Sequence, residues 1–288
     1  MLTAVVTGEH PMYKKTCTCA LLLSSLVLAP AATTVAVSES QVPVSRAEYE
    51  ALLAKTQRVE DRGDVENLFS RYMYLHSAFE DRQIPALWVR KGTPGIHSQY
   101  SNNGVYTTWD SVMVYHRDRP HPAGKLVFHY SANPMIEVAE DGKSAKGLWV
   151  VAGVESGLAS PEAVRLAPDY MYTNSTVDGK RVWAHTIQLK YGIDFLKQDG
   201  RWKIWHFHCF EVSRSPYGTD WITFASKSQN QPFSNDLMYF GEDGKPVFMP
   251  KPDAPVTIRN NPYRTDASQT LDARPPEPYR TFADTFEY

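Results

Sequence analysis

Apolar residues early in the chain recur every three or four positions, from residue 45 to about residue 89. One face of this pattern carries Val65, Leu68, Phe69, Tyr72, Leu75, His76 and Phe79. The spacing is typical of an amphipathic helix. Gly63 separates two helical runs, and Pro85 fits the first turn of a short third helix. The sequence therefore predicts helices before residue 91.

Beyond Lys91 the period shortens to two, and Gly and Pro punctuate the chain. The alternation predicts strands at residues 125–131, 135–139, 145–153, 181–196 and 201–212. The turns Glu140–Lys143 and Gln198–Gly200 read as hairpin connections between neighbouring strands. Helices followed by a strand meander predict an α+β fold, with the helices on one face of a strongly curved antiparallel sheet.

The last part of the chain, residues 213–288, is rich in Pro, Asn, Ser and Asp and lacks a strong period. It is predicted to be an extended irregular arm that wraps the core or a neighbouring subunit. The chain thus divides into a leader at 1–38, a folded domain at 45–212 and a C-terminal extension at 213–288.

The leader has the pattern of a secretory signal. Lys14 and Lys15 precede an apolar run of residues 19–29, and small residues follow at 29–32. A membrane-spanning helix needs about 20 apolar residues, so this run is too short to span. Met12 could be the true start, since it places the basic pair near the N-terminus. We expect a secreted or periplasmic protein without membrane contact after cleavage of the leader.

The amino-acid composition of the chain limits the classes of partner that it can bind. The 288 residues carry 30 Lys+Arg and 32 Asp+Glu, so no basic field exists for a nucleic acid. Aromatic residues make up 12%, which suits either an enclosed apolar ligand or a large aromatic core. Cys17 and Cys19 lie in the leader, which leaves Cys209 without an intramolecular disulfide partner.

Three segments resemble a known family. Residues 65–78 look like the opening helix of SnoaL-like proteins, which belong to the nuclear transport factor 2-like superfamily. Residues 129–138, followed by Asp141-Gly142, are similar to the family's strand and hairpin, and residues 199–204 look like its closing hairpin. The resemblance covers roughly residues 45–212.

The resemblance implies a cone-shaped α+β fold with one deep pocket. Relatives include scytalone dehydratase, ketosteroid isomerase, polyketide cyclases and bile acid 7α-dehydratase. They work without metal or organic cofactor, using a His or Asp base and Tyr donors on hydrophobic, aromatic or polycyclic molecules. Other members only bind ligands, and many form homo-oligomers, which this chain could also do. Fold alone does not decide among these functions.

His129 is the first candidate for a general base. It lies on a predicted strand before Asn133-Pro134. The pKa of a histidine needs the smallest shift for the side chain to accept a proton near neutral pH. By resemblance it matches the strand histidine of the dehydratases. The alternative is a histidine of the core or rim with a backbone partner.

The helix offers Tyr72, Tyr74 and His76. Tyr72 and His76 are four residues apart and share a face, whereas Tyr74 lies about 160° from His76 around the helix. Both tyrosines therefore cannot point straight into one pocket. The family usually has a Tyr and then an Asp here, and this sequence has His76-Ser77 instead. Either His76 takes the acidic residue's role, or Tyr72 and His76 are packing residues.

His206 and His208 alternate on one predicted strand and so share a face. Metal ligation would need further ligands such as His185, Glu211 or Asp194. A catalytic or substrate-binding role for His208 is the stronger hypothesis, with a structural pair as the alternative. The sequence contains no G-x-S-x-G elbow, phosphate-binding loop or H-E-x-x-H motif. We expect no metal and no cofactor.

Together these features predict a cofactor-free lyase, dehydratase or isomerase that acts on a hydrophobic aromatic or polycyclic small molecule. His129 would be the base, His76 or His208 its partner, and Tyr72 or Tyr74 the donor to the substrate oxygen. The alternative is a non-catalytic small-molecule binding protein of the same fold.

Overall fold

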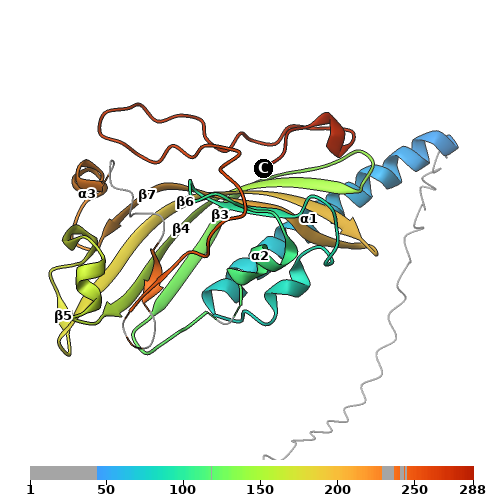
Figure 1. Cartoon of the computed structure of the whole chain (residues 1–288). Helices are drawn as coiled ribbons and strands as arrows, with labels where there is room; N and C mark the ends of the chain where they lie inside the picture. The colour runs from blue at the N-terminus through green and yellow to red at the C-terminus, as the bar shows by residue number, and fades with distance from the viewer. Residues whose placement is uncertain (1–43, 118, 229–236, 241–242, 244) are drawn as a thin grey trace, which may run out of the picture. The chain divides into compact units, whose positions relative to one another are not determined.

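A single long helix opens the folded part of the chain in a computed structural model (Figure 1), which describes residues 44–117, 119–228, 237–240, 243 and 245–288. This helix, α1, runs unbroken over Arg46–Ser77, and Ser45 caps it in a capping box with Glu48. Gly63 does not interrupt it. A mid-helix Gly costs only about 1 kcal/mol, which good helix formers on both sides offset. The leader at 1–38 lies outside the described residues.

The sheet is mixed, not purely antiparallel as predicted. Its strands follow the order β2-β1-β7-β6-β4-β3, with β5 paired to β6. β1 lies parallel to β7, whereas the other paired strands of this sheet are antiparallel within the described residues. β1 has four residues, all buried, so it lacks the alternation that revealed the longer strands. The strands are β1 (His97–Tyr100), β2 (Val105–Tyr106), β3 (Leu126–Val138), β4 (Ser144–Ala159), β5 (Thr176–Val177), β6 (Lys180–Gln198) and β7 (Arg201–Pro216).

Irregular points shape the long strands. Asn133, with φ of 50°, and Pro134 form a bulge within β3, so the two predicted strands there are one. Asp199 and Gly200 both have positive φ, at 50° and 72°, in the two-residue turn that joins β6 to β7. β7 has two bulges opposite β6 and continues to Pro216, four residues past the predicted domain boundary.

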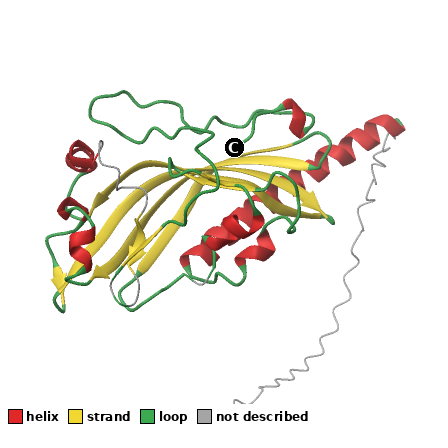
Figure 2. Ribbon diagram, in the orientation of Figure 1, coloured by secondary structure: helices red, strands yellow, loops and turns green. Residues whose placement is uncertain are grey.

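The two faces of the sheet have different covers (Figures 1 and 2). The inner face packs against α1, the 3-10 helix η1 (Ile84–Leu87) and α2 (Trp109–Val114), and its core includes Phe69 stacked on Trp149 at 4.2 Å between ring centroids. The outer face carries Leu148 and Phe210, which pack against Tyr288 from the C-terminal arm, residues 217–288. The predicted α+β fold with an extended arm is therefore confirmed.

The arm contains the short helix α3 (Trp221–Ser228) and a separate two-stranded sheet of β8 (Leu237–Phe240) and β9 (Pro246–Phe248). Two further 3-10 helices, η2 (Ala163–Leu166) and η3 (Asp169–Met171), lie between β4 and β5, and η4 (Phe282–Asp284) lies near residue 288. Within the described part of the chain, no helix is both long and apolar enough to cross a membrane.

Candidate functional site

A cavity of about 90 Å³ lies on the inner face of the sheet, between that face and the end of α1. We call it the inner cavity. Its wall combines aromatic side chains with charged ones, which is the usual make-up of a small-molecule site. The residues used below are His76, Tyr100, Tyr115, Arg119, His129, Glu155, Tyr191, Cys209, Glu211 and Arg214.

Two neighbouring strands bring His129 and Glu155 together. His129 on β3 lies opposite Gly153 on β4, and Glu155, two residues further along, projects from the same face. Nε2 of His129 is 3.1 Å from Oε1 of Glu155. A Cβ on Gly153 would come 2.5 Å from Cδ2 of His129, so the absence of a side chain there makes room for the imidazole.

The proton positions of this pair follow from its surroundings. Burial opposes ionisation of Glu155, but the hydrogen bond and charge of His129, together with the charge of Arg214, lower the pKa of Glu155 below its usual value. The ionised carboxylate can only accept, so Nε2 of His129 carries the hydrogen that faces it. Both ring nitrogens of His129 are buried, and neither meets full hydrogen-bond geometry with a described residue, so Nε2 contacts Glu155 at ion-pair distance only. With the hydrogen placed on Nε2, next to the carboxylate, Nδ1 is the basic nitrogen of the ring.

His76 lies beside this pair, with its ring stacked on that of His129 at 5.7 Å between centroids. Burial, followed by the charge of Arg119, lowers the pKa of His76 well below its usual value, so the ring is neutral. An Arg119 nitrogen is 3.1 Å from Nδ1 of His76 and 3.4 Å from Nε2. A guanidinium has no acceptor, so the nearer nitrogen, Nδ1, accepts and Nε2 carries the hydrogen. His76 is thus a neutral donor.

Arg119 is held in place by a buried carboxylate. Its Nη2 and Nε donate to Asp81 at 2.6 and 2.8 Å, and Nη2 also donates to the backbone carbonyl of His76 at 2.8 Å. The side chains of Arg119 and Asp81 are 4% and 5% exposed. Both guanidinium bonds to Asp81 end on Oδ1, and Oδ2 accepts from the backbone amide of Arg119 at 2.7 Å, so the buried pair fixes the orientation of the guanidinium as well as its charge. Arg119 therefore positions His76.

The rest of the wall is neutral or paired. Burial raises the pKa of Tyr100 and Tyr191 well above the usual value, so both hydroxyls stay protonated. Burial also raises the pKa of the Cys209 thiol to about 12, which makes it a poor nucleophile. Arg214 Nε donates to Glu211 at 2.9 Å. The tyrosines can donate hydrogen bonds into the cavity, and the cysteine cannot supply a thiolate.

The model of one protein family, the SnoaL-like domain, matches residues 57–208, which is more than half of the chain. The match begins within α1 and ends on β7. The chain belongs to the SnoaL-like family. A comparison with curated proteins found no match.

Solved structures similar to this SnoaL-like chain have low identity. A putative scytalone dehydratase from Novosphingobium aromaticivorans is 16% identical, with a TM-score of 0.41, and the match covers 58% of this chain and 93% of that one. A hexachlorocyclohexane dehydrochlorinase, LinA-type3 from Novosphingobium barchaimii, is 14% identical over 58% and 96%, with a TM-score of 0.42. A nuclear transport factor 2-like protein from N. aromaticivorans is 14% identical over 57% and 88%, with a TM-score of 0.38.

The SnoaL-like domain brings together only two of the five predicted site residues. His129 and His76 line the inner cavity. Tyr72 is buried behind His76, packed between that ring and Phe207, and does not line the cavity. Tyr74 points away from it and is 75% exposed. Tyr100 and Tyr191 line the cavity instead.

His208 lies on the outer face of the sheet, so it cannot be the partner of His129. Its Nε2 accepts from Gln99 at 3.0 Å, and its Nδ1 lies 3.3 Å from the carbonyl oxygen of Tyr288. Burial lowers the pKa of His208 to about 3. The predicted pairing failed because the two-residue period places His206 and His208 on one face without saying which face.

The sequence interpretation missed Glu155, Arg119 and Arg214. Glu155 lies beyond the predicted end of its strand at residue 153, so its face could not be assigned. Arg119 lies in a loop, where no period places it. Arg214 follows a bulge that shifts the alternation of β7, so counting by two from His208 puts it on the wrong face.

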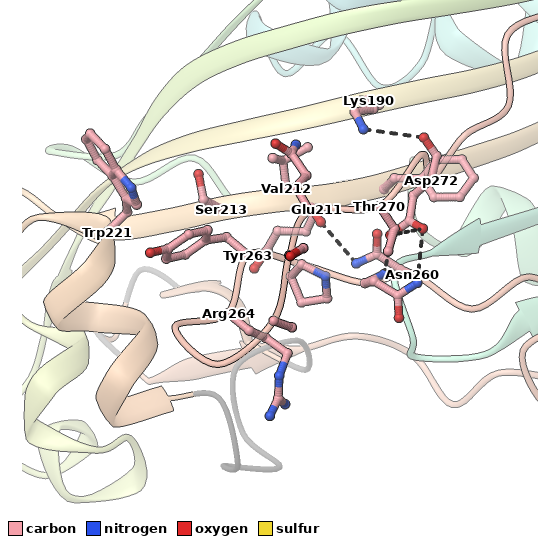
Figure 3. Close-up of a pocket in the computed structure, with 16 residues that line it drawn as sticks. Lys190, Glu211, Val212, Ser213, Trp221, Asn260, Tyr263, Arg264, Thr270 and Asp272 are labelled. Atoms are coloured by element: carbon pink, nitrogen blue, oxygen red, sulfur yellow. Dashed lines mark hydrogen bonds between the residues drawn. The ribbon is translucent and has the colours of Figure 1, made fainter.

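A second cavity, of about 300 Å³, lies between β7 and the C-terminal arm (Figure 3). Trp221 and Tyr263 line it, and its charged groups already have hydrogen-bond partners in the protein. Lys190 donates to the backbone carbonyl of Asp272 at 3.3 Å, and the Asp272 carboxylate accepts from Asn261 and Thr270. We call it the arm cavity. It suits binding better than proton transfer.

Proposed function

We propose that this SnoaL-like protein is a cofactor-free lyase of the dehydratase type, or an isomerase, that acts on a small hydrophobic molecule in the inner cavity. One observation carries the proposal. The imidazole of His129 lies at ion-pair distance from the Glu155 carboxylate, with Nε2 3.1 Å from Oε1, and neither ring nitrogen is taken up by a hydrogen bond from another described residue. This is the arrangement that a histidine needs to act as a general base.

In the proposed reaction, Nδ1 of His129 takes a proton from a carbon of the substrate. The Glu155 carboxylate stabilises the imidazolium that forms, through the hydrogen on Nε2. Nε2–H of His76 and the tyrosine hydroxyls donate to the substrate oxygen as negative charge develops on it. For a dehydration, the imidazolium then returns the proton to the departing hydroxyl, which leaves as water. For an isomerisation, the proton returns to another carbon.

The volume of the inner cavity narrows the substrate. At about 90 Å³ it lies well below the roughly 300–1,000 Å³ of pockets that hold drug-sized ligands. It therefore suits a compound of about one ring, and a polycyclic substrate would require side chains such as Met249 to move. The sequence predicts an aromatic or polycyclic substrate, and of these two kinds of compound we favour an aromatic one with a single ring.

The test is a panel of monocyclic compounds that bear a hydroxyl β to an acidic C–H bond, or an isomerisable carbonyl. The wild-type chain and a His129→Gln variant are incubated with each compound, and products are followed by mass spectrometry. We expect turnover in the wild type, with His129→Gln lowering kcat by about 10²–10⁴-fold and ligand affinity far less. Equal loss of turnover and affinity would contradict the proposal.

The second candidate function is non-catalytic binding, favoured by the arm cavity. Its volume of about 300 Å³ reaches the range of ligand pockets, and Trp221 and Tyr263 offer aromatic surface. If a compound binds without turnover, and a Trp221→Ala variant loses that binding while His129→Gln keeps it, this second function is supported.

The predicted export of the protein and its predicted homo-oligomer are also part of the proposal. Export to the periplasm or outside the cell would be tested by N-terminal sequencing of the protein recovered from those fractions. A homo-oligomer would be tested by light scattering. Its contact surface could include the first half of α1, where three apolar side chains are at least half exposed. They are Leu52 at 61%, Leu53 at 50% and Val59 at 73%.

A further inference from the structure

Three side chains with metal-binding atoms meet on the outer face, on the opposite side of the sheet from the inner cavity. His97 comes from β1, His206 from β7 and Glu287 from the C-terminal arm. One ligand atom from each lies within 4.8 Å of the other two. The cluster thus joins segments that are far apart in the sequence.

His206 is oriented as a metal ligand would be. Its Nδ1 is 2.8 Å from Oδ2 of Asp194, a fully buried carboxylate that also forms an ion pair with the ammonium of Lys146. Nε2 of His206 is buried and has no hydrogen-bond partner among the described residues, and His206 is 1% exposed. Zinc-bound histidines commonly donate from their other ring nitrogen to a carboxylate, which fixes the ring, and Asp194 is placed to do this for His206. A buried nitrogen without a hydrogen-bond partner is also a position where a ligand is expected to bind.

Of the other two ligands, Glu287 has a side chain that is 57% exposed, whereas that of His97 is 11% exposed. His97 Nδ1 is 3.4 Å from Oε1 of Glu287 and 3.2 Å from the backbone carbonyl oxygen of Gly95, a contact that an ion would have to displace. Both residues line an open cavity of about 360 Å³, which provides a path for an ion. The rings of His97 and His206 are stacked, with centroids 4.2 Å apart. Asp194 fixes His206, so His97, at the mouth of the cavity, is the ring that would rotate to direct its lone pair at the ion.

We propose that His97, His206 and Glu287 form a binding site for a divalent transition-metal ion, with zinc as the expected occupant. Two imidazoles and one carboxylate are a common zinc ligand set, and a water would complete the tetrahedron. Imidazole nitrogen disfavours magnesium and calcium, which prefer sets made of oxygen. The ion would fasten the end of the arm to the sheet. The site is independent of the proposed reaction in the inner cavity.

This inference departs from the expectation of no metal, and also from the His206–His208 site that the sequence offered as the weaker hypothesis. Of that pair only His206 takes part, because both ring nitrogens of His208 lie against Gln99 and Tyr288. His97 replaces His208, since the parallel pairing of β1 with β7 places it opposite His206. A four-residue strand gave no sign of this pairing in the sequence.

The experiment uses the full chain without a polyhistidine tag, freed of metal with a chelator and dialysed. Zinc is titrated by calorimetry, and Co²⁺ is added separately to record its visible d–d bands. The test variants are Glu287→Gln and His97→Asn. The matched controls are Glu277→Gln, an exposed carboxylate elsewhere on the arm, and His121→Asn, an exposed histidine outside the cluster.

We expect one zinc per chain and a higher melting temperature with zinc. Each test variant should weaken the zinc Kd by about tenfold or more and remove the cobalt bands, while both controls bind as the wild type. Absence of zinc binding by the wild type would overturn the proposal. So would wild-type affinity in Glu287→Gln and His97→Asn, because the ion would then lie on other ligands.

Discussion

The carboxylate of Glu155 reaches His129 because Gly153, the residue directly across from His129, has no side chain. The imidazole occupies the space over Gly153, and Oε1 of Glu155 lies 3.1 Å from its Nε2. The proposed base and its partner thus come from adjacent strands of a rigid sheet. Catalytic groups on such elements are held more accurately than groups on loops.

Replacing Glu155 by Gln should reduce turnover more than substrate binding. The amide keeps the size of the side chain but cannot stabilise the imidazolium of His129 as a carboxylate does. We expect kcat to fall by about 10²-fold or more with a smaller change in KM, measured on the compound that the panel identifies. Glu137→Gln, an acid on β3 outside the cavity lining, is the control and should retain wild-type rates. Equal rates for the two variants would contradict this role.

The same pair should contribute to stability in a pH-dependent way. The pKa of Glu155 is lowered in the folded chain, so the ionised carboxylate favours the folded state. This contribution is present above the unfolded pKa of about 4.3 and is lost as pH falls through the folded value. The wild type should therefore lose more unfolding free energy than Glu155→Gln between about pH 6 and pH 3, measured by urea titration. Parallel losses would contradict the lowered pKa.

Asp194 should be far more important to stability than an exposed acid. Its side chain is 0% exposed and accepts from Lys146, from His206 and from the backbone amide of Tyr288. Asp194→Asn leaves the Lys146 ammonium buried without a counter-charge, which should cost about 3–5 kcal/mol. Asp110→Asn, which breaks an exposed pair with Lys91, should cost less than about 1 kcal/mol. Urea unfolding of both variants tests the contrast, and similar costs would contradict it.

Gly63→Ala should stabilise the chain. Gly63 lies inside α1, and no atom beyond its chain neighbours and the nearby backbone of the helix lies within 4 Å of the place where its Cβ would be. Alanine is the better helix former by about 1 kcal/mol, so the unfolding free energy should rise by up to that amount. The control is Gly142→Ala in the β3–β4 turn, where φ is 66° and a side chain is strained, so stability should fall. A loss of stability in Gly63→Ala would indicate that the helix does break near Gly63.

The sequence predicted the elements whose side chains obey one period over many residues. The long strands β6 and β7, the turn at Asp199-Gly200 and the apolar face of α1 were all found in this way. The interrupted helix was wrong, because the cost of a single Gly is small beside the propensity of the residues around it. β1 was missed, because a four-residue strand is too short for a pattern.

The candidate site was harder to predict than the fold. His129 was found because the family resemblance singled it out, and His76 because it shares a helix face with Tyr72 at the place where the sequence departs from the family's pattern. Their partners Glu155 and Arg119 come from segments without a usable signal, and only the register of β3 with β4 places Glu155 beside His129. His208 was misplaced because alternation gives two faces without their identity.

Gly192→Ala should loosen the C-terminal arm without affecting the inner cavity. A Cβ on Gly192 would collide with the ring of Tyr288, which packs on β6 at this point. Displacing the ring would break the bond from its backbone amide to Asp194 and the 2.6 Å bond from its hydroxyl to the carbonyl of Arg274.

We expect the arm of this variant to be cleaved faster in limited proteolysis, because local opening becomes easier. Its zinc affinity should also fall, since Glu287 adjoins Tyr288, whereas turnover in the inner cavity should stay at the wild-type level. Gly63→Ala serves as the matched Gly-to-Ala control and should change neither proteolysis of the arm nor zinc binding. Wild-type proteolysis of Gly192→Ala would mean that the ring of Tyr288 does not fasten the arm. Loss of turnover would mean that the two faces of the sheet are coupled.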